Sequence, residues 1–549
     1  MFLIFLVKFL FNLISNSNII FIRFNIKQNR NVFTILLQIR IQNICIIDMY
    51  IFCRRDKVKI LFIYPETPST FWSFKDALKF VSKKAAEPPL GLITVAAMLP
   101  KEWNKKLIDC NISKLNSKDI LWADYVFISA MNVHLRSFRE IVRRCNKLGV
   151  KVVAGGPLCT TQYKDLLGVD HFILNEAEIT LPLFLEDLKN GNPKHVYETN
   201  EFPEIDLTPV PMWELLDMKK YASMSLQYSR GCPYDCEFCS ITMLNGRTPR
   251  AKCAEQFIAE LDRLYELNWR GGISVVDDNF IGNKRKLKTE FLPALINWSK
   301  KRNYPFFFIT EVSINLADDD ELMRLMVEAG FNSVFVGIET PNSNSLTECG
   351  KAINLKRNLV DSVNKLQRNG MIVSGGFIVG FDNDTESVFD EQIDFIQQSG
   401  IANAMVGLLN APTGTKLFKR MKEEGRLLDM FSGNNMDASI NFIPKMDYSK
   451  LIRGYSRLLN TIYSQEEYYK RLKVFLKEYS VPHWTPKKLN LEQVKAFLRL
   501  LWLLGVIEKG KKYFWKLLFF SLSKYPRKFP TAMTLAVYGF HFRRVIRTV

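Results

Sequence analysis

The first long stretch of the chain with a regular hydrophobic pattern runs from residue 57 to residue 197. Short apolar runs alternate there with amphipathic stretches, and the runs predict the strands Val58–Tyr64, Lys106–Asp109, Tyr125–Ser129, Val150–Ala154 and His171–Leu174. Helices are predicted between them, notably Gly91–Leu99 and Leu135–Leu148. Apolar strands that alternate with helices form a parallel sheet covered on both faces. We therefore expect a doubly wound, Rossmann-like α/β domain over residues 57–197.

A second alternation begins after Met224. It predicts the strands Met224–Tyr228, Gly272–Val276, Phe306–Thr310, Ser333–Gly337, Met371–Ile378 and Asn403–Leu408. The helices predicted between them are Ala254–Leu267, Lys286–Lys300, Asp319–Ala329, Asn354–Asn369 and Thr385–Gln398. Six strand–helix units in succession fit a partial (β/α)6 barrel over residues 223–428, whose functional residues should lie at the carboxyl ends of the strands.

The remaining segments have other patterns. Residues 198–222 are rich in proline and poor in periodicity, which predicts a linker. Residues 429–549 are basic, aromatic and free of cysteine, and they predict a helical C-terminal domain. Its expected helices are Ile452–Ile462, Glu466–Tyr479, Leu491–Leu504 and Tyr513–Leu522. A helical cap on the barrel is the simplest interpretation of this domain.

Residues 1–56 form an N-terminal extension that takes no part in the functional argument. The segment from Met1 to Ile22 is apolar but interrupted by polar residues, and no small-residue cleavage site follows it. It is either a marginal membrane anchor or the product of a start codon placed too far upstream. We slightly favour the second interpretation, with translation from Met49.

Composition and charge narrow the class of protein. An apolar fraction of 47% excludes wholesale disorder, and a chain of 549 residues is expected to form two or three domains. Seven of the ten cysteines are scattered, which argues against a disulfide framework and for the reducing cytoplasm. The net charge is +19, and residues 451–549 hold 20 Lys and Arg against five Glu. Such a tail suggests an anionic membrane surface or a nucleic acid, the latter being the less favoured partner.

The strongest chemical signal is the loop that follows the first barrel strand. Cys232, Cys236 and Cys239 stand in the run RGCPYDCEFCS, with three residues between the first pair and two between the second. Three thiolates on one tight loop can hold three irons of a [4Fe–4S] cube and leave the fourth iron open, whereas such clusters normally have four cysteines. The alternatives are three structural thiols or a zinc site without its fourth ligand, and zinc usually takes its cysteines in CxxC pairs.

This cysteine run resembles the motif of the radical S-adenosylmethionine (SAM) superfamily, and the residues between its cysteines are similar to those of the cobalamin-binding branch. The resemblance implies a [4Fe–4S] cluster, SAM bound to its open iron, and cleavage of SAM to a 5′-deoxyadenosyl radical. It covers roughly residues 57–540, and the order of domains resembles that of enzymes such as hopanoid C-2 methylases, whose helical C-terminal domain has no assigned role.

Polar residues and glycines follow the other barrel strands, and in this superfamily such positions contact SAM. The resemblance implies that Asp277, Asp278 and Asn279 hold the SAM ammonium group, with Glu311 after the next strand and Glu339 near the ribose or carboxylate. It likewise places an adenine-binding surface further along the barrel. The residues expected there are Gly376, Ile378, Gly380, Asn410 and Pro412. Each position taken singly is equally well explained as a strand-end turn, and Asp277 as a helix cap.

The N-terminal domain resembles the cobalamin-binding domains that precede many radical SAM cores. Its candidate cobalamin contacts are strand-end residues, namely Asn132, His134, Gly155, Gly156 and Pro157. The Asp-x-His-x-x-Gly motif of domains that supply a histidine to cobalt is absent, so we expect His134 to be a capping or surface residue. If cobalamin binds, we expect a base-off form without a protein histidine on its lower face.

The leading hypothesis is a cobalamin-dependent radical SAM methyltransferase that acts on an unactivated carbon of a small molecule or of a lipid such as a hopanoid. The alternatives are a radical SAM cyclase or rearrangement enzyme, and a corrinoid or iron–sulfur sensor without turnover. The expected cofactors are the [4Fe–4S] cluster, SAM and cobalamin, with flavodoxin or ferredoxin as electron donor. We expect a cytoplasmic protein that contacts the inner face of the membrane through its basic C-terminal domain.

Overall fold

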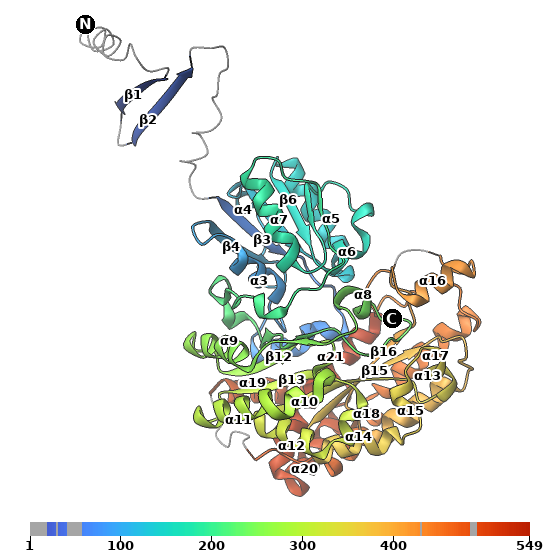
Figure 1. Cartoon of the computed structure of the whole chain (residues 1–549). Helices are drawn as coiled ribbons and strands as arrows, with labels where there is room; N and C mark the ends of the chain where they lie inside the picture. The colour runs from blue at the N-terminus through green and yellow to red at the C-terminus, as the bar shows by residue number, and fades with distance from the viewer. Residues whose placement is uncertain (1–18, 29–30, 41–57, 429–430, 484–490, 549) are drawn as a thin grey trace. The chain divides into compact units, whose positions relative to one another are not determined.

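A computed structural model of the chain describes residues 19–28, 31–40, 58–428, 431–483 and 491–548 (Figure 1). The chain divides into two units, and the described part of the first consists of residues 19–28, 31–40, 58–59 and 102–104. In the first unit β1 (Ile19–Gln28) pairs antiparallel with β2 (Asn31–Arg40). Residues 1–18 and Met49 lie outside the described residues, so both interpretations of the N-terminal extension stay predictions.

The N-terminal sheet of the second unit has the strand order β4-β3-β5-β6-β7-β8, and the neighbours from β3 to β8 run parallel. This order reverses between β3 and β5, which is where doubly wound sheets bind ligands. The predicted Rossmann-like domain is confirmed. Its strands are β3 (Lys59–Tyr64), β4 (Asn104–Asp109), β5 (Tyr125–Ser129), β6 (Lys151–Gly155), β7 (His171–Ile173) and β8 (Val196–Tyr197), and its main helices are α3 (Leu90–Met98), α5 (Leu135–Lys147) and α7 (Ala177–Lys189).

The central sheet has the order β16-β15-β14-β13-β12-β9 with all neighbours parallel, which confirms the predicted partial barrel. Side chains alternate between the two faces of each strand, so that Phe306, Phe308 and Thr310 are buried while Phe307 and Glu311 are exposed on the opposite face. The strands are β9 (Ser223–Leu226), β12 (Gly271–Val275), β13 (Phe306–Val312), β14 (Phe331–Glu339), β15 (Ile372–Val379) and β16 (Asn403–Leu408).

The helices of the barrel match the predictions with one clear difference. The predicted helix Asn354–Asn369 begins five residues later, as α14 (Leu359–Arg368). The Asn354 side chain instead donates hydrogen bonds to the carbonyls of Gly337 and Ile338, and Asn358 caps the helix. The other barrel helices are α9 (Ala254–Glu266), α11 (Leu292–Lys301), α12 (Asp320–Ala329), α13 (Ser343–Glu348), α15 (Val388–Ser399) and α16 (Lys416–Glu423).

The C-terminal helices share one hydrophobic core with the barrel. Helix α21 (Phe529–Val545) is buried on nearly all sides and contacts β16. Its Phe542 ring makes an edge-to-face contact with the Phe71 ring, with ring centroids 5.4 Å apart. The helical C-terminal segment therefore acts as a cap, as expected. Its helices are α17 (Tyr448–Ile462), α18 (Gln465–Glu478), α19 (Leu491–Trp502), α20 (Lys511–Lys524) and α21 (Phe529–Val545), with a π-helical turn, η13 (Leu503–Ile507), after α19.

The segment predicted as a linker is packed against both α/β sheets. Trp213 and Tyr221 are fully buried, and the Tyr221 hydroxyl donates a hydrogen bond to Asp109 in the N-terminal domain. Residues Ala85 and Tyr221 form a parallel bridge beside β9, so a piece of the N-terminal domain extends the barrel sheet at its edge. This contact fixes the two α/β domains against each other, while the domain boundaries themselves stay predictions.

Candidate functional site

The cysteine loop begins at the carboxyl end of β9, where the barrel fold places functional residues. Gly231 has φ +94°, and a Cβ atom there would lie within 2.9 Å of the carbonyl oxygens of Asn245 and Thr248. Only glycine fits this position without displacing the backbone. The short pair β10 (Ser229–Arg230) and β11 (Arg250–Ala251) closes the base of the loop. The loop is therefore held in one conformation by its own backbone.

The three cysteines of the loop are free thiols that lie close enough to perturb one another electrostatically. Burial raises the pKa of the Cys239 thiol to about 12, so iron binding must displace its proton. In the described part of the chain, no three His, Cys, Asp or Glu side chains converge on one metal-ion position. A cubane takes each thiolate on a separate iron, so the three thiols of this loop fit a cluster.

The Asp277-Asp278-Asn279 run holds the cysteine loop. Asp277 is buried and accepts hydrogen bonds from the backbone N–H groups of Tyr228 and Ser229, at 2.7 Å each. Asp278 accepts from the Gly231 N–H at 2.9 Å. Burial raises the pKa of Asp277 to about 7. Sequence reasoning placed this run near the SAM ammonium group, and the structure adds a second role that the motif did not reveal.

Asn279 contacts the same loop at its first cysteine. Its Oδ1 accepts a hydrogen bond from the Ser313 N–H at 3.1 Å. Its side chain also contacts the Cys232 thiol and lowers the pKa of that thiol, although burial raises the pKa overall. Asn279 therefore connects a candidate cluster ligand to the end of β13.

Lys351 and Glu339 form a buried ion pair beside the thiols, with Nζ 2.9 Å from Oε1. Although burial alone lowers the pKa of Lys351, Glu339 and the thiols of Cys236 and Cys239 raise it, so the ammonium group stays charged. Glu339 itself has φ +63°, a strained conformation for this residue type. Sequence reasoning found Glu339 and missed Lys351, which follows the buried Cys349 by two residues.

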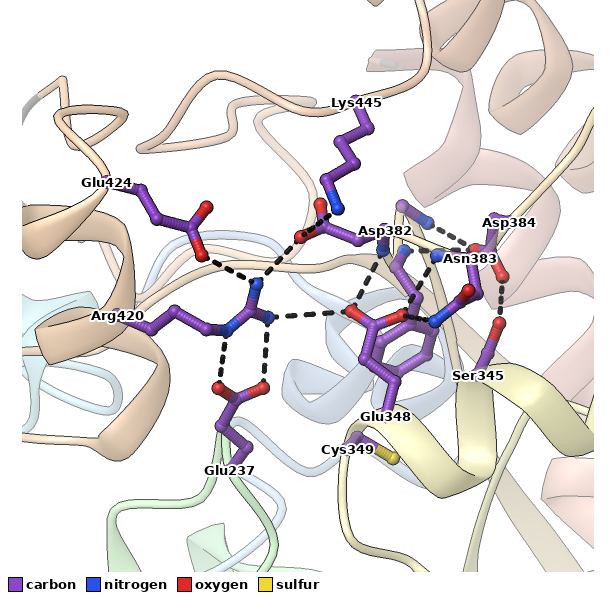
Figure 2. A network of polar contacts seen from close by, with 12 residues as sticks. Glu237, Ser345, Glu348, Cys349, Asp382, Asn383, Asp384, Arg420, Glu424 and Lys445 are labelled. Carbon is purple, nitrogen blue, oxygen red and sulfur yellow. Dashed lines mark hydrogen bonds and ion pairs between the residues drawn. The ribbon is translucent and has the colours of Figure 1, made fainter.

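Figure 2 shows an ionic network that anchors the cysteine loop from outside. Glu237, between the second and third cysteines, accepts hydrogen bonds from Arg420 Nε and Nη2 at 2.6 and 3.0 Å. Arg420 also donates to Asp382 at 2.7 Å, and Asp382 accepts from Arg426. The Glu348 carboxylate accepts a hydrogen bond from the backbone N–H of Asp382 at 2.9 Å. The network joins the loop to α16 and to the turn after β15.

Two carboxylates face the inside of the barrel. The Glu311 side chain is accessible on the inner face of β13. Protein atoms around its carboxyl group nevertheless remove much of its hydration. This desolvation, together with the neighbouring carboxylates Asp278 and Glu87, raises the pKa of Glu311 to about 8. Glu87 comes from the N-terminal domain and accepts hydrogen bonds from Ser225 and Ser274. Burial raises the pKa of Glu87 as well. Sequence reasoning missed Glu87, because nothing local in the sequence places it inside a barrel formed 140 residues later.

The candidate adenine surface lies along β15 and after β16. Ile378 is half-buried on β15, and a Cβ at Gly376 would lie 2.8 Å from the Phe335 ring. Asn410 accepts from the Asn441 N–H and donates to the Ser439 carbonyl, so its amide is already bonded to the protein. The buried Thr413 hydroxyl near the half-buried Pro412 has no hydrogen-bond partner among the residues that the structure describes. Gly380 has φ +106°, which favours glycine there.

His134 is fully buried, and of the two roles predicted for it, a capping or a surface residue, the structure shows the capping role. Its Nδ1 accepts the Met131 N–H at 3.1 Å, which caps the 3₁₀ turn η4 (Asn132–His134) that leads into α5. Nε2 therefore carries the proton and lies 2.9 Å from the Thr67 hydroxyl. Burial lowers the pKa of His134 to about 4, so the ring is neutral at pH 7. Both ring nitrogens have partners within the protein.

The other cobalamin candidates lie on the same edge of the N-terminal sheet. A Cβ at Gly155 would lie 2.7 Å from the Ile173 carbonyl oxygen, and one at Gly156 2.7 Å from the Ser129 hydroxyl. A larger residue at either position would clash with atoms of the same domain, so packing within the domain already requires glycine at both positions. Pro157 starts a short helix, and Asn132 lies against Gly433 from the segment after the barrel.

Three domain families match the chain. A B12 binding domain matches residues 81–185, the radical SAM superfamily matches residues 226–396, and a domain of unknown function, DUF4070, matches residues 415–549. The first two fall on the two α/β sheets, and the third on the helical cap. The fold and the cysteine loop thus define a radical SAM protein with an N-terminal B12-binding domain.

Two relatives extend the match over most of the chain. An uncharacterised methyltransferase of Synechocystis, sll1242, is 41% identical over 89% of this chain and 93% of its own length. The hopanoid C-2 methylase of Rhodopseudomonas palustris is 33% identical over 83% of this chain and 88% of its own. The chain belongs to the cobalamin-dependent radical SAM methyltransferase family that includes these proteins.

Solved structures support the same fold. The cobalamin-dependent SAM radical enzyme OxsB, solved with aqua-cobalamin and SAM, aligns with a TM-score of 0.57 over 90% of this chain and 80% of its own at 14% identity. The radical SAM methyltransferase TsrM from Kitasatospora setae, solved with cobalamin and a [4Fe–4S] cluster, aligns with a TM-score of 0.54 over 73% of this chain and 85% of its own, also at 14% identity.

Proposed function

We propose that this methyltransferase methylates an unactivated sp³ carbon of a polycyclic lipid of the hopanoid class. The main observation behind the proposal is the cysteine loop at the carboxyl end of β9, which hydrogen bonds and ion pairs hold in place in a chain with a B12-binding domain. The substrate class comes from the 33% identity with the R. palustris hopanoid C-2 methylase. Phe307 and Phe335, on β13 and β14, supply apolar surface that suits such a substrate.

Different residues of the chain would bind the different cofactors. Cys232, Cys236 and Cys239 would hold the cluster, with Lys351 as a neighbouring positive charge. When bound, the cluster, SAM and methylcobalamin would supply reductive SAM cleavage, hydrogen abstraction and methyl delivery. The protein positions these groups and excludes water from the radical.

We assign the SAM contacts to side chains and backbone at the strand ends. Glu311 has no hydrogen bond to another described residue and is free to meet a ligand inside the barrel, whereas Asp277 is committed to the cysteine loop. The unpartnered Thr413 hydroxyl beside Pro412 supports an adenosyl contact after β16. Cobalamin would lie at the edge with Asn132 and Gly155-Gly156, without a histidine ligand, because His134 uses both ring nitrogens elsewhere.

The decisive experiment follows the methyl group. Anaerobically reconstituted, reduced protein is incubated with methyl-labelled SAM and a hopanoid, and labelled methylhopanoid and 5′-deoxyadenosine are measured. A rearranged, unlabelled product would instead indicate a cyclase, and bound cofactors without 5′-deoxyadenosine would indicate a sensor. Cys236→Ala should lose iron and both products. Cys349→Ala is the matched control, because this buried thiol lies beside the site but outside the cysteine run.

We further propose that an acidic one-electron carrier such as flavodoxin or ferredoxin reduces the cluster. Arg247 and Lys416 are both exposed and both pair with Asp235 on the cysteine loop. They supply positive charge at the outer side of the loop, which complements an acidic carrier. Reduction by flavodoxin should slow with rising ionic strength, and the double change Arg247→Gln and Lys416→Gln should remove much of this salt dependence.

The chain also fits a cytoplasmic location with peripheral contact at the membrane. No helix of the described residues is both long and apolar enough to cross a bilayer.

A further inference from the structure

The solvent face of α19 carries a row of exposed apolar side chains. Val494, Leu498, Trp502 and Val506 recur every four residues and follow one side of α19 into η13, where Ile507 adjoins them. Leu498 and Trp502 are each 60% exposed. Leu500 and Leu504, on the opposite side, are buried and bind the helix to the rest of the protein. The row is thus additional to the residues needed for packing.

The row continues onto α20, which forms the lower edge of the second unit in Figure 1. Trp515 donates a hydrogen bond from Nε1 to the Gly505 carbonyl at 2.9 Å and stacks on Phe519 with ring centroids 5.9 Å apart. Phe519 is 62% exposed. We define the apolar stripe by its exposed members: Val494, Leu498, Trp502, Val506, Ile507, Phe519 and Leu522. Contiguous exposed apolar surface of this kind marks an interaction site.

Basic side chains border the stripe. Residues 491–528 contain nine Lys and Arg and two Glu. Lys512 and Lys516 lie on the same side of α20 as Phe519 by helical spacing, and both are exposed. Long lysine side chains can lie along an apolar surface and keep their charge at its rim. Apolar side chains with an amphipathic tryptophan in the middle and cations at the edge match the interface of an anionic bilayer.

We propose that the apolar stripe docks this protein on an anionic lipid bilayer. The large side chains Leu498, Trp502 and Phe519 enter the headgroup region, and the bordering lysines meet lipid phosphates. An acidic protein partner or a second copy of the chain would also cover apolar surface. A second copy would bring the same basic border against itself, which disfavours it. Docking would bring the enzyme to the lipid substrate proposed above, and vesicle binding does not require turnover.

The test measures binding of the purified full chain to sedimented vesicles, without substrate. We expect binding to vesicles enriched in phosphatidylglycerol, weaker binding to pure phosphatidylcholine, and weakening by salt. The double variant Leu498→Ser and Trp502→Ser should lower binding about tenfold. Lys512→Glu with Lys516→Glu should abolish the preference for phosphatidylglycerol.

The control variant removes exposed apolar side chains elsewhere. Leu121→Ser with Leu167→Ser changes residues that are 60% and 87% exposed in the N-terminal domain, and it should bind vesicles like the wild type. Circular dichroism and thermal unfolding show whether the stripe variant keeps its fold. Equal binding by the stripe variant and the wild type would overturn the proposal. So would a stripe variant that changes the oligomeric state and leaves vesicle binding intact.

A separate measurement distinguishes this inference from the proposed function. Methyl transfer to a hopanoid dispersed in detergent does not require a bilayer. Loss of vesicle binding with retained methylation in detergent would support the docking role. Retained methylation in a wild-type protein that never binds vesicles would reject the docking and leave the proposed function in place.

Discussion

Glu237 and Arg420 are 183 positions apart in sequence and form a two-pronged ion pair at the cysteine loop. The Glu237 N–H donates to the Cys349 carbonyl, and the Leu417 N–H donates to the Glu237 carbonyl. Backbone and side chain of this one residue thus attach the loop to α13 and α16. Because the loop carries the candidate cluster ligands, we expect this pair to position the cluster.

The first prediction follows from this pair. Arg420→Gln leaves Glu237 without its counter-ion, whereas Asp382 keeps Arg426, and we expect a loss of about 2 kcal/mol of stability because the Glu237–Arg420 pair is partly buried. We also expect reduced iron content after reconstitution and a changed EPR signal of the reduced cluster. Arg420→Lys should restore part of both, since it keeps the charge and loses the two-pronged geometry.

A matched control exists for this substitution. Arg457 makes a two-pronged pair with Asp390 on the surface, with side chains 51% and 62% exposed. Arg457→Gln should cost less than about 1 kcal/mol and leave iron binding unchanged. Equal iron content in the Arg420→Gln protein and this control would contradict a positioning role for Arg420.

The second prediction concerns the buried Lys351 ammonium group. A positive charge near a cluster stabilises the reduced, more negative state, so Lys351→Met should lower the midpoint potential. We expect a shift on the order of 60 mV, the one-electron equivalent of a tenfold change in equilibrium constant. Lys351→Arg should leave the potential closer to that of the wild type. An EPR-monitored redox titration measures all three proteins, and an unchanged potential in Lys351→Met would refute the electrostatic role.

The third prediction uses the Glu311 carboxyl. Its folded-state pKa of about 8 lies above the ordinary value, so the folded chain binds this proton more tightly than the unfolded chain does. Glu311 therefore favours folding at low pH, and this contribution falls as the pH rises toward about 8. Glu311→Gln should flatten the decline in thermal midpoint between about pH 5 and pH 8. Parallel pH profiles of the two proteins would exclude the raised pKa.

The arrangement of strands and the cysteine loop could be predicted because both are local signals. Strand periodicity and the spacing of Cys232, Cys236 and Cys239 lie within short windows of sequence. α21 escaped prediction for the opposite reason. It is buried nearly all round, so the polar face that reveals an amphipathic helix is missing.

The site residues that were missed are those that act across long sequence separations. Glu87 reaches Ser274 from 187 positions away, and Arg420 reaches Glu237 from 183. Such pairs leave no spacing signature in one sequence. His134 was predicted to be a capping or surface residue, and its burial could not be predicted because it depends on the packing of the Thr67 segment over the ring. Local chemistry was therefore predictable, and the tertiary environment was not.

The last prediction concerns the contact between the two α/β domains. Arg230, just before the cysteine loop, donates to Glu176 at 2.5 Å and to Glu178 at 2.8 Å, and all three side chains are largely buried. Arg250 also pairs with Glu176, so removal of Arg230 leaves Glu178 without a cation. Although burial raises the pKa of Glu178, Arg230 lowers it below its ordinary value. Arg230→Met should cost about 3 kcal/mol, because an uncompensated charge stays buried.

A double change tests whether the unpaired carboxylate is the cause. Glu178→Gln added to Arg230→Met removes the orphaned charge and should recover a large part of the lost stability in urea unfolding. The single variant should also expose residues 198–222 to faster proteolysis, since the domains separate more easily. Arg143→Met is the surface control, because its pair with Glu140 is exposed and should change neither measurement. A double variant no more stable than Arg230→Met would show that lost packing, rather than charge, determines the effect.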